Sequence, residues 1–174
     1  MAKKILLILM CVVVNGAYAS DRDEDKLGRC AEASIQKNGY VVSDCAKIQT
    51  AAQDRCAEAT INKNGYVSSD CLRLTEGGRC AVASLEKSGY ISSDCLRIGF
   101  KGQDRCAEAA IKKNGYVSSD CLRLTEGGRC AVASLEKNGY ISSDCVRVGS
   151  KVQDRCAEAS IRRVGYVTSD CLAL

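Results

Sequence analysis

The sequence contains no histidine and no tryptophan, and Phe100 is its only phenylalanine. Without histidine, the side chain that most often acts as a general base near neutral pH is missing. Structural zinc sites usually combine histidines or closely spaced cysteine pairs, and this chain has neither histidine nor a C-x-x-C motif. These absences argue against an enzyme and against a zinc-binding repeat. The shortage of bulky core residues indicates a fold that depends on covalent crosslinks.

Long apolar runs are also scarce, and the one candidate lies at the N-terminus. Lys3 and Lys4 precede an apolar stretch over residues 5–14, and an Ala-Tyr-Ala sequence ends at Ala19. This pattern predicts a secretory signal peptide, residues 1–19, whose apolar stretch is too short to span a membrane. The remaining chain keeps 23 of the 25 basic residues against 21 acidic ones. So balanced a charge carries no specific nucleic-acid signal, and we predict no membrane span.

An acidic segment, residues 20–28, follows the predicted signal peptide. Asp21, Asp23, Asp25 and Glu32 match four positions of a calcium-binding loop. Lys26, however, stands where that loop needs a glycine. We therefore interpret the segment as a solvated acidic N-terminus, and we predict neither a metal nor another cofactor.

Twelve of the 13 cysteines lie after residue 19, and an exported chain would pair them as disulfides. They form six pairs with a constant internal spacing of fifteen residues: Cys30 and Cys45, Cys56 and Cys71, Cys80 and Cys95, Cys106 and Cys121, Cys130 and Cys145, and Cys156 and Cys171. We predict a bridge within each pair. Pairing each second cysteine with the first cysteine of the next pair would leave Cys30 and Cys171 without a partner. In a strictly antiparallel hairpin the two cysteines would lie too far apart, so this pairing requires a steep helix crossing.

The cysteine pairs mark six copies of one unit. The separation between consecutive pairs alternates between 11 and 9 residues, so the true period is a double unit of fifty residues. Residues 53–99 and 103–149 differ at only five of 47 positions, which indicates a tandem duplication and a repeat array. The predicted repeats cover about residues 29–50, 54–76, 78–99, 104–126, 128–149 and 154–174.

Each copy predicts a hairpin of two short helices. In the second copy, Asp54 can cap the first helix, Gly65 suits the left-handed position that ends it, and Tyr66 is expected to pack back on Ile61. Ser68 can cap the shorter second helix. One hairpin is too small to bury a core, whereas stacked hairpins bury one continuously. We therefore predict an all-α, disulfide-stapled, solenoid-like array of six short helical hairpins.

One arginine directly precedes the first cysteine of every pair, where a helix N-terminus would disfavour a cation. These residues form a candidate binding stripe for an acidic partner: Arg29, Arg55, Arg79, Arg105, Arg129 and Arg155. The alternative is solvation or an ion pair with the aspartate before each second cysteine: Asp44, Asp70, Asp94, Asp120, Asp144 and Asp170. That alternative is the simpler interpretation of surface charge.

Two further positions could form a binding surface. A tyrosine follows each Asn-Gly or equivalent turn, and the six could stack on glycans or bases: Tyr40, Tyr66, Tyr90, Tyr116, Tyr140 and Tyr166. We interpret them first as packing residues. Glu58 and Glu108 are replaced by Val82 and Val132 in alternate copies, which indicates core packing or an outward binding face.

These observations predict a secreted or periplasmic repeat protein that acts as a non-enzymatic binding or structural module. Its partner is an unknown protein or an acidic polymer. One alternative is a secreted effector or inhibitor directed at another cell. Another is a precursor of small cysteine-rich peptides, although the linkers 75–78 and 99–102 contain no dibasic processing site.

Overall fold

The computed structural model describes residues 28–174. The predicted signal peptide, the acidic segment before Gly28 and the calcium-loop positions Asp21, Asp23 and Asp25 lie outside the described residues. The described chain contains helices and no strand, so the all-α prediction is confirmed. Its six long helices are α1 (Arg29–Asn38), α2 (Ala51–Asn64), α4 (Gly78–Ser88), α5 (Lys101–Asn114), α7 (Gly128–Asn138) and α9 (Lys151–Val164). Its short helices are η2 (Ser43–Lys47), α3 (Ser69–Leu72), η3 (Ser93–Arg97), α6 (Ser119–Arg123), α8 (Ser143–Val146) and α10 (Ser169–Leu172).

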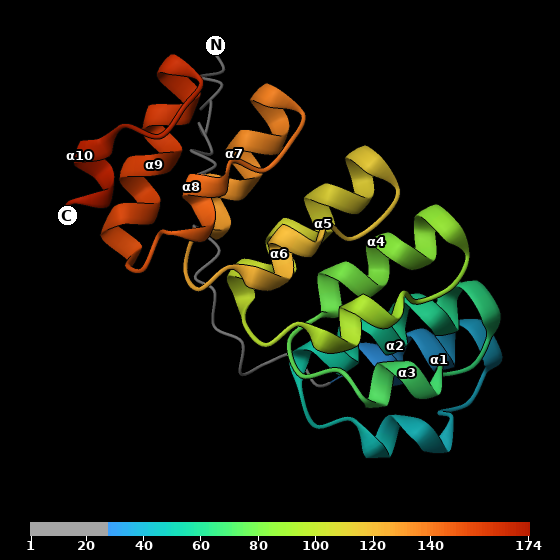
Figure 1. The fold of residues 1–174 in the computed structure, drawn as a ribbon. Coiled ribbons are helices and arrows are strands. Elements are labelled where there is room, and N and C mark those ends of the chain that lie inside the picture. The colour runs from blue at the N-terminus through green and yellow to red at the C-terminus, as the bar shows by residue number, and fades with distance from the viewer. Residues whose placement is uncertain (1–27) are drawn as a thin grey trace, which may run out of the picture.

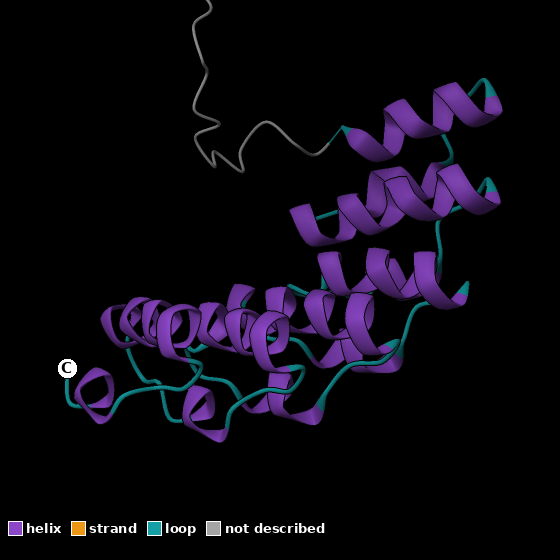
Figure 2. Cartoon of the chain, turned by 90° about the horizontal axis from the view of Figure 1, so that it is seen from above, coloured by secondary structure: helices purple, strands orange, loops and turns teal. Residues whose placement is uncertain are grey.

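The long helices pack side by side in chain order and form one layer (Figure 1). Each packs against the next, from α1 and α2 through to α7 and α9. The short helices lie against one side of this layer, as the C-terminal repeats show in the view from above (Figure 2). All long helices run in the same direction, so the layer has an N-terminal edge and a C-terminal edge. The predicted solenoid-like array is therefore confirmed.

Each long helix ends where the sequence predicts, at the glycine before the tyrosine. These glycines adopt left-handed backbone with φ between 80° and 91°: Gly39, Gly65, Gly89, Gly115, Gly139 and Gly165. The cap glycine N–H donates to the carbonyl four residues earlier, as Gly65 does to Ile61. At the start of α3 the Ser68 side chain accepts from the Asp70 N–H, which confirms the predicted cap of the second helix.

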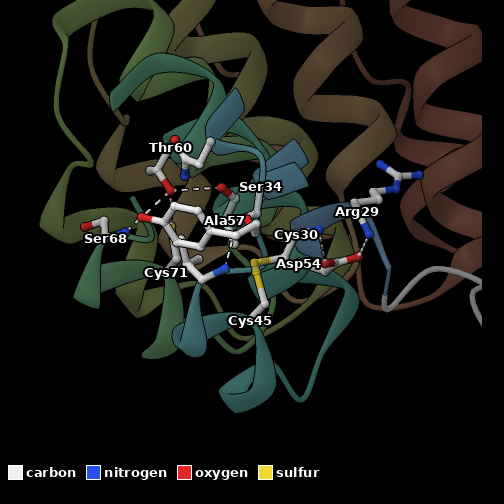
Figure 3. The surroundings of a disulfide bond; sticks show 12 residues. Arg29, Cys30, Ser34, Cys45, Asp54, Ala57, Thr60, Ser68 and Cys71 are labelled. Carbon is white, nitrogen blue, oxygen red and sulfur yellow. Dashed lines mark hydrogen bonds between the residues drawn. A yellow bond between two sulfur atoms is a disulfide. The ribbon is translucent and has the colours of Figure 1, made fainter. Parts of the chain in front are cut away.

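Asp54 does not cap its own helix, so that prediction is wrong. Helix α2 begins at Ala51, and the Thr50 side chain caps it by accepting from the Gln53 N–H. The Asp54 carboxylate instead accepts from the backbone N–H groups of Cys30, at 2.9 Å, and Arg29, at 3.2 Å, at the start of α1 (Figure 3). Asp104 and Asp154 cap α4 and α7 in the same way. The longer linker before α2 adds a helical turn, and this turn brings the aspartate beside the preceding helix.

The C-terminal edge also uses caps supplied by a neighbour. The Lys63 Nζ donates to the Leu85 carbonyl of α4 at 2.6 Å, and Lys113 does the same to Leu135 of α7. Asn38 donates to the Gly65 carbonyl at 2.7 Å. Parallel helices place like ends of their dipoles together, and carboxylates at one edge with ammonium groups at the other offset this repulsion. The positions of Lys63 and Lys113 near the ends of their helices thus have a structural cause.

The interfaces between repeats alternate in kind. An aspartate cap joins α1 to α2, α4 to α5 and α7 to α9, whereas a close backbone contact joins α2 to α4 and α5 to α7. A Cβ added at Gly78 would lie 2.8 Å from the Cα and the carbonyl oxygen of Ala52. A Cβ at Gly128 would lie 2.6 Å from the Cα of Gly102. The Gly-Gly linkers therefore allow a helix approach that no side chain would permit.

All six disulfides form within repeats, as predicted, with Cα–Cα distances of 5.3–5.6 Å. The eight residues of α2 after Cys56 rise about 12 Å. The four residues 65–68, of which Ser68 is extended, can cover a similar length on the way back. This extended segment brings Cys71 level with Cys56. The chain therefore does not need a second long helix to return from the end of α2 to the level of Cys56. The disulfides lie in a continuous core with aliphatic residues such as Ile61, Leu74 and Ile98, and so many of them indicate an oxidising compartment.

Candidate functional site

The arginine stripe is divided by the different lengths of the helices. Arg29, Arg79 and Arg129 lie in the first turn of α1, α4 and α7, where the expected conflict with the helix dipole exists. Arg55, Arg105 and Arg155 lie one turn further along, because α2, α5 and α9 begin four residues before them. The prediction that all six oppose a helix N-terminus therefore holds for three of them.

The first set of arginines pairs with glutamates of the following repeat. The Arg29 and Glu58 side chains approach to 3.7 Å, and Arg79 and Glu108 do the same. Arg129 reaches Glu158 at 3.5 Å. The predicted pairing of these arginines with the aspartates before the second cysteines is wrong. Five of those aspartates instead pair with the cation three residues later on the same short helix: Lys47, Arg73, Arg97, Arg123 and Arg147.

The second set of arginines, Arg55, Arg105 and Arg155, forms no ion pair within residues 28–174. The alternation of glutamate and valine explains this for two of them. Arg29 reaches Glu58 in the next repeat, but the residue equivalent to Glu58 opposite Arg55 is Val82. Opposite Arg105 it is Val132. Two arginines per chain are thus left without a carboxylate by a specific substitution in the neighbouring copy.

Val82 and Val132 are not core residues, although core packing is the interpretation that the sequence favours. Each is only partly buried and lines a groove between two long helices. The first groove lies between α2 and α4, and the second lies between α5 and α7, fifty residues later. Their volumes are about 500 and 540 Å³. We refer to these two as the inter-helix grooves.

The two inter-helix grooves have matching linings. The first is lined by Arg55, Glu58, Ala59, Asn62, Lys63, Val82, Leu85 and Glu86. The second is lined by the equivalents of these residues, with Lys112 in place of Asn62, and also by Arg79. Each lining combines the apolar side chains of an alanine, a valine and a leucine with several charged ones. It includes Arg55 or Arg105, which form no ion pair within the described residues, so a carboxylate of a ligand could take the place that Glu58 takes beside Arg29.

Arg55 and Arg105 also border hollows at the N-terminal edge of the layer. One hollow includes Arg55, Arg79, Lys101 and Arg105, together with Asp104 and Glu76. The equivalent hollow fifty residues later includes Arg105, Arg129, Lys151 and Arg155, together with Asp154 and Glu126. Basic side chains outnumber acidic ones in both, and Asp104 and Asp154 already accept backbone hydrogen bonds. The surroundings of the second set of arginines therefore favour an anion.

Burial dominates the electrostatics of Asp104, which is 6% exposed. Desolvation raises the pKa of its carboxyl to about 6, while the N–H groups of Cys80 and Arg79 and the Arg79 charge act in the opposite direction. The pKa of Asp154 is also raised, again chiefly by burial. These carboxyls cap helices, so their titration bears on stability.

The tyrosines are mostly exposed, which does not favour the packing interpretation. All six side chains lie at the C-terminal edge and are 60–65% exposed: Tyr40, Tyr66, Tyr90, Tyr116, Tyr140 and Tyr166. The following residue fills the core in their place, as Val67, Val117 and Val167 do at 7–8% exposure. Ile61, the expected partner of Tyr66, is fully buried.

The structure also shows what the described residues lack. Residues 28–174 contain no cluster of three or more histidine, cysteine or acidic side chains that could hold a metal ion. Across the same residues, no helix has the length and apolarity needed to cross a bilayer. Comparison of the chain with protein-family models, with curated proteins and with solved structures finds no match.

Proposed function

We propose that this protein is an exported, non-enzymatic binding module that holds an acidic partner, a protein or a polymer, in its inter-helix grooves. Export to the periplasm or the extracellular space, with cleavage after Ala19, is part of the proposal and agrees with the six disulfides. The observation that supports binding is the replacement of Glu58 by Val82 and Val132 opposite Arg55 and Arg105.

The chemistry of this arrangement suits a ligand that has both charge and apolar surface. A guanidinium group donates to a carboxylate in a directed, charge-assisted contact. The valine and alanine floor adds apolar burial that a simple counter-ion would not use. Because the two grooves repeat along the array, a repetitive ligand could occupy both and bind more tightly than one site allows.

The neighbour-supplied caps count against the peptide-precursor alternative. A repeat cut from the array would lose the Asp54 cap on α1 or the Lys63 cap on α4. The effector or inhibitor alternative shares the binding step and differs in where the partner resides.

The test compares two double variants that remove the same charge. R55Q/R105Q changes two arginines that form no ion pair within the described residues, and R29Q/R129Q changes arginines that pair with Glu58 and Glu158 and line neither groove. Binding of the oxidised chain to polyglutamate and to an anionic matrix should weaken about tenfold or more in R55Q/R105Q, the loss of about one charged hydrogen bond. R29Q/R129Q should change it much less. Equal losses would mean that only net charge matters, and the groove proposal would be wrong.

A third variant approaches the same question from the opposite side. V82E/V132E places a carboxylate at the position that Glu58 occupies opposite Arg29. It should satisfy Arg55 and Arg105 internally and weaken binding without removing either arginine. The ion pairs are surface pairs, so stability should change by only about 0–1 kcal/mol. Undiminished binding by V82E/V132E would contradict the proposed site.

A further inference from the structure

The row of tyrosines at the C-terminal edge is a second surface, and no tyrosine lines the grooves. Tyr66 and Arg55 lie at opposite ends of α2, eleven residues apart in the sequence. The long helices stand side by side (Figure 1), and one tyrosine follows each of them, so the six tyrosines succeed one another along one edge. More than half of the surface of each tyrosine is exposed, so these residues contribute little to the core.

The backbone that carries the rings is held in place. The hydroxyl of Ser34 donates to the Tyr40 carbonyl at 2.7 Å and accepts from the Val42 N–H at 2.9 Å. Ser84, Ser134 and Ser160 form the same pair of bonds around Tyr90, Tyr140 and Tyr166. The preceding left-handed glycine fixes the turn from the other side. At these four tyrosines the fold thus anchors the main chain and leaves most of the residue exposed, which limits the entropy lost when a ligand stacks on the ring.

Three of the six cations that close the long helices are already in use. Lys63, Lys113 and Lys137 donate to main-chain carbonyls of the following helix. Single-stranded nucleic acid needs a basic track beside the aromatic rings, and these lysines do not provide an open one. An uncharged ligand suits the row better. A tyrosine offers such a ligand a flat apolar face and a hydroxyl that both donates and accepts.

The interval between neighbouring tyrosines further limits the class of ligand. Neighbouring helices typically pack about 8–10 Å apart, so the turns that carry the tyrosines should recur at about that interval. In a linear β-linked polysaccharide, consecutive sugars turn over, and every second sugar presents the same apolar face at a comparable interval. Stacked bases recur at a shorter one.

We propose that the tyrosine row binds a linear, uncharged, β-linked polysaccharide, with every second sugar stacked on one tyrosine. This goes beyond the groove function and does not depend on it. A chain with both surfaces joins a polysaccharide at one edge to an acidic partner in the grooves.

The experiment measures retention of the oxidised chain on particles of cellulose and of chitin. The variant Y66A/Y90A/Y116A removes three adjacent rings and should weaken binding at least tenfold, since even stacking of a nucleobase on one aromatic ring is worth roughly 5- to 150-fold. The matched variant Y66F/Y90F/Y116F keeps the rings and should stay within about threefold of the unmodified chain. Because the rings are exposed, both should keep the parent melting temperature.

Two controls separate this proposal from the groove proposal. High salt and R55Q/R105Q should leave retention on the particles unchanged, because neither acts on stacking. Absence of binding to both polysaccharides, or equal losses in the alanine and phenylalanine variants, would overturn the proposal. Salt-sensitive binding of a single-stranded oligonucleotide that the alanine variant loses, without binding to either polysaccharide, would also overturn it and would assign the row to bases.

Discussion

Replacement of Gly78 by alanine tests the close backbone contact between α2 and α4. The new Cβ would lie 2.8 Å from the Ala52 backbone, where ordinary contacts begin at 3.4 Å, so the two helices must separate locally by about 0.6 Å. Backbone cannot rotate away as a side chain can, and overpacking of this kind costs about 1–3 kcal/mol. Alanine returns up to about 1 kcal/mol through its better helix propensity. The net expectation is a loss of about 1–2 kcal/mol, or a decrease in Tm of about 2–8 °C for a chain of this size.

Gly28 provides a matched control in the same protein. It occupies the equivalent position before α1, and a Cβ there would meet nothing within 4 Å. We therefore expect G28A to change stability by no more than about 0.5 kcal/mol. G128A, whose Cβ would meet the Cα of Gly102 at 2.6 Å, should repeat the loss seen for G78A. Thermal and denaturant unfolding followed by circular dichroism would measure all three. Similar stabilities for G28A and G78A would refute the argument that close approach requires these glycines.

Two further predictions concern the crosslinks and pH. Proteolysis without reduction should release peptides that link Cys56 to Cys71 and Cys106 to Cys121, and the intact mass should lie about 12 Da below the reduced value; a peptide joining Cys71 to Cys80 would contradict this. Asp104, with its pKa raised from 3.8 to about 6, keeps its proton in the folded chain between about pH 4 and 6 while the unfolded chain has released it. Stability should therefore fall as the pH rises through this window, by on the order of 2–3 kcal/mol from this group. The D104N variant should lose that part of the pH dependence in denaturant titrations, and an unchanged slope would rule out Asp104 as its source.

The features that repeat within one copy could be predicted from the sequence. A constant cysteine spacing identified the disulfides, and Gly65 identified the end of α2, because both depend on residues close together in the chain. Asp54 was assigned to the wrong helix, since its partners, the N–H groups of Arg29 and Cys30, lie in the preceding repeat. Rules for helix capping consider only residues close together in the chain, so they do not predict a cap that a neighbouring parallel helix supplies.

The candidate site was partly predictable for the same reason. The arginine register was visible, but its division into paired and unpaired sets depends on contacts such as Arg29 with Glu58, 29 residues apart. A signal for this division did exist. The change from Glu58 to Val82 follows the same two-repeat alternation as the change from Gln53-Asp54 to Gly77-Gly78. No sequence signal predicted the exposure of the tyrosines. The residue that follows the left-handed glycine can turn its side chain either onto the preceding helix or towards solvent.

The alternation of interfaces also limits how such a chain can lengthen or shorten. An aspartate-capped joint must be followed by a glycine joint, because the residues for each kind are carried by different copies. Loss of a single repeat would place two long helices of the same kind side by side. Either both would supply an aspartate cap or both would need one. Loss of fifty residues, by fusing Ala52 directly to Gln103, would leave every remaining joint matched. The pair of repeats, rather than the single repeat, is therefore the smallest piece that recombination can insert or remove without a fold defect, and the near-identity of 53–99 and 103–149 shows that insertion has happened in that size.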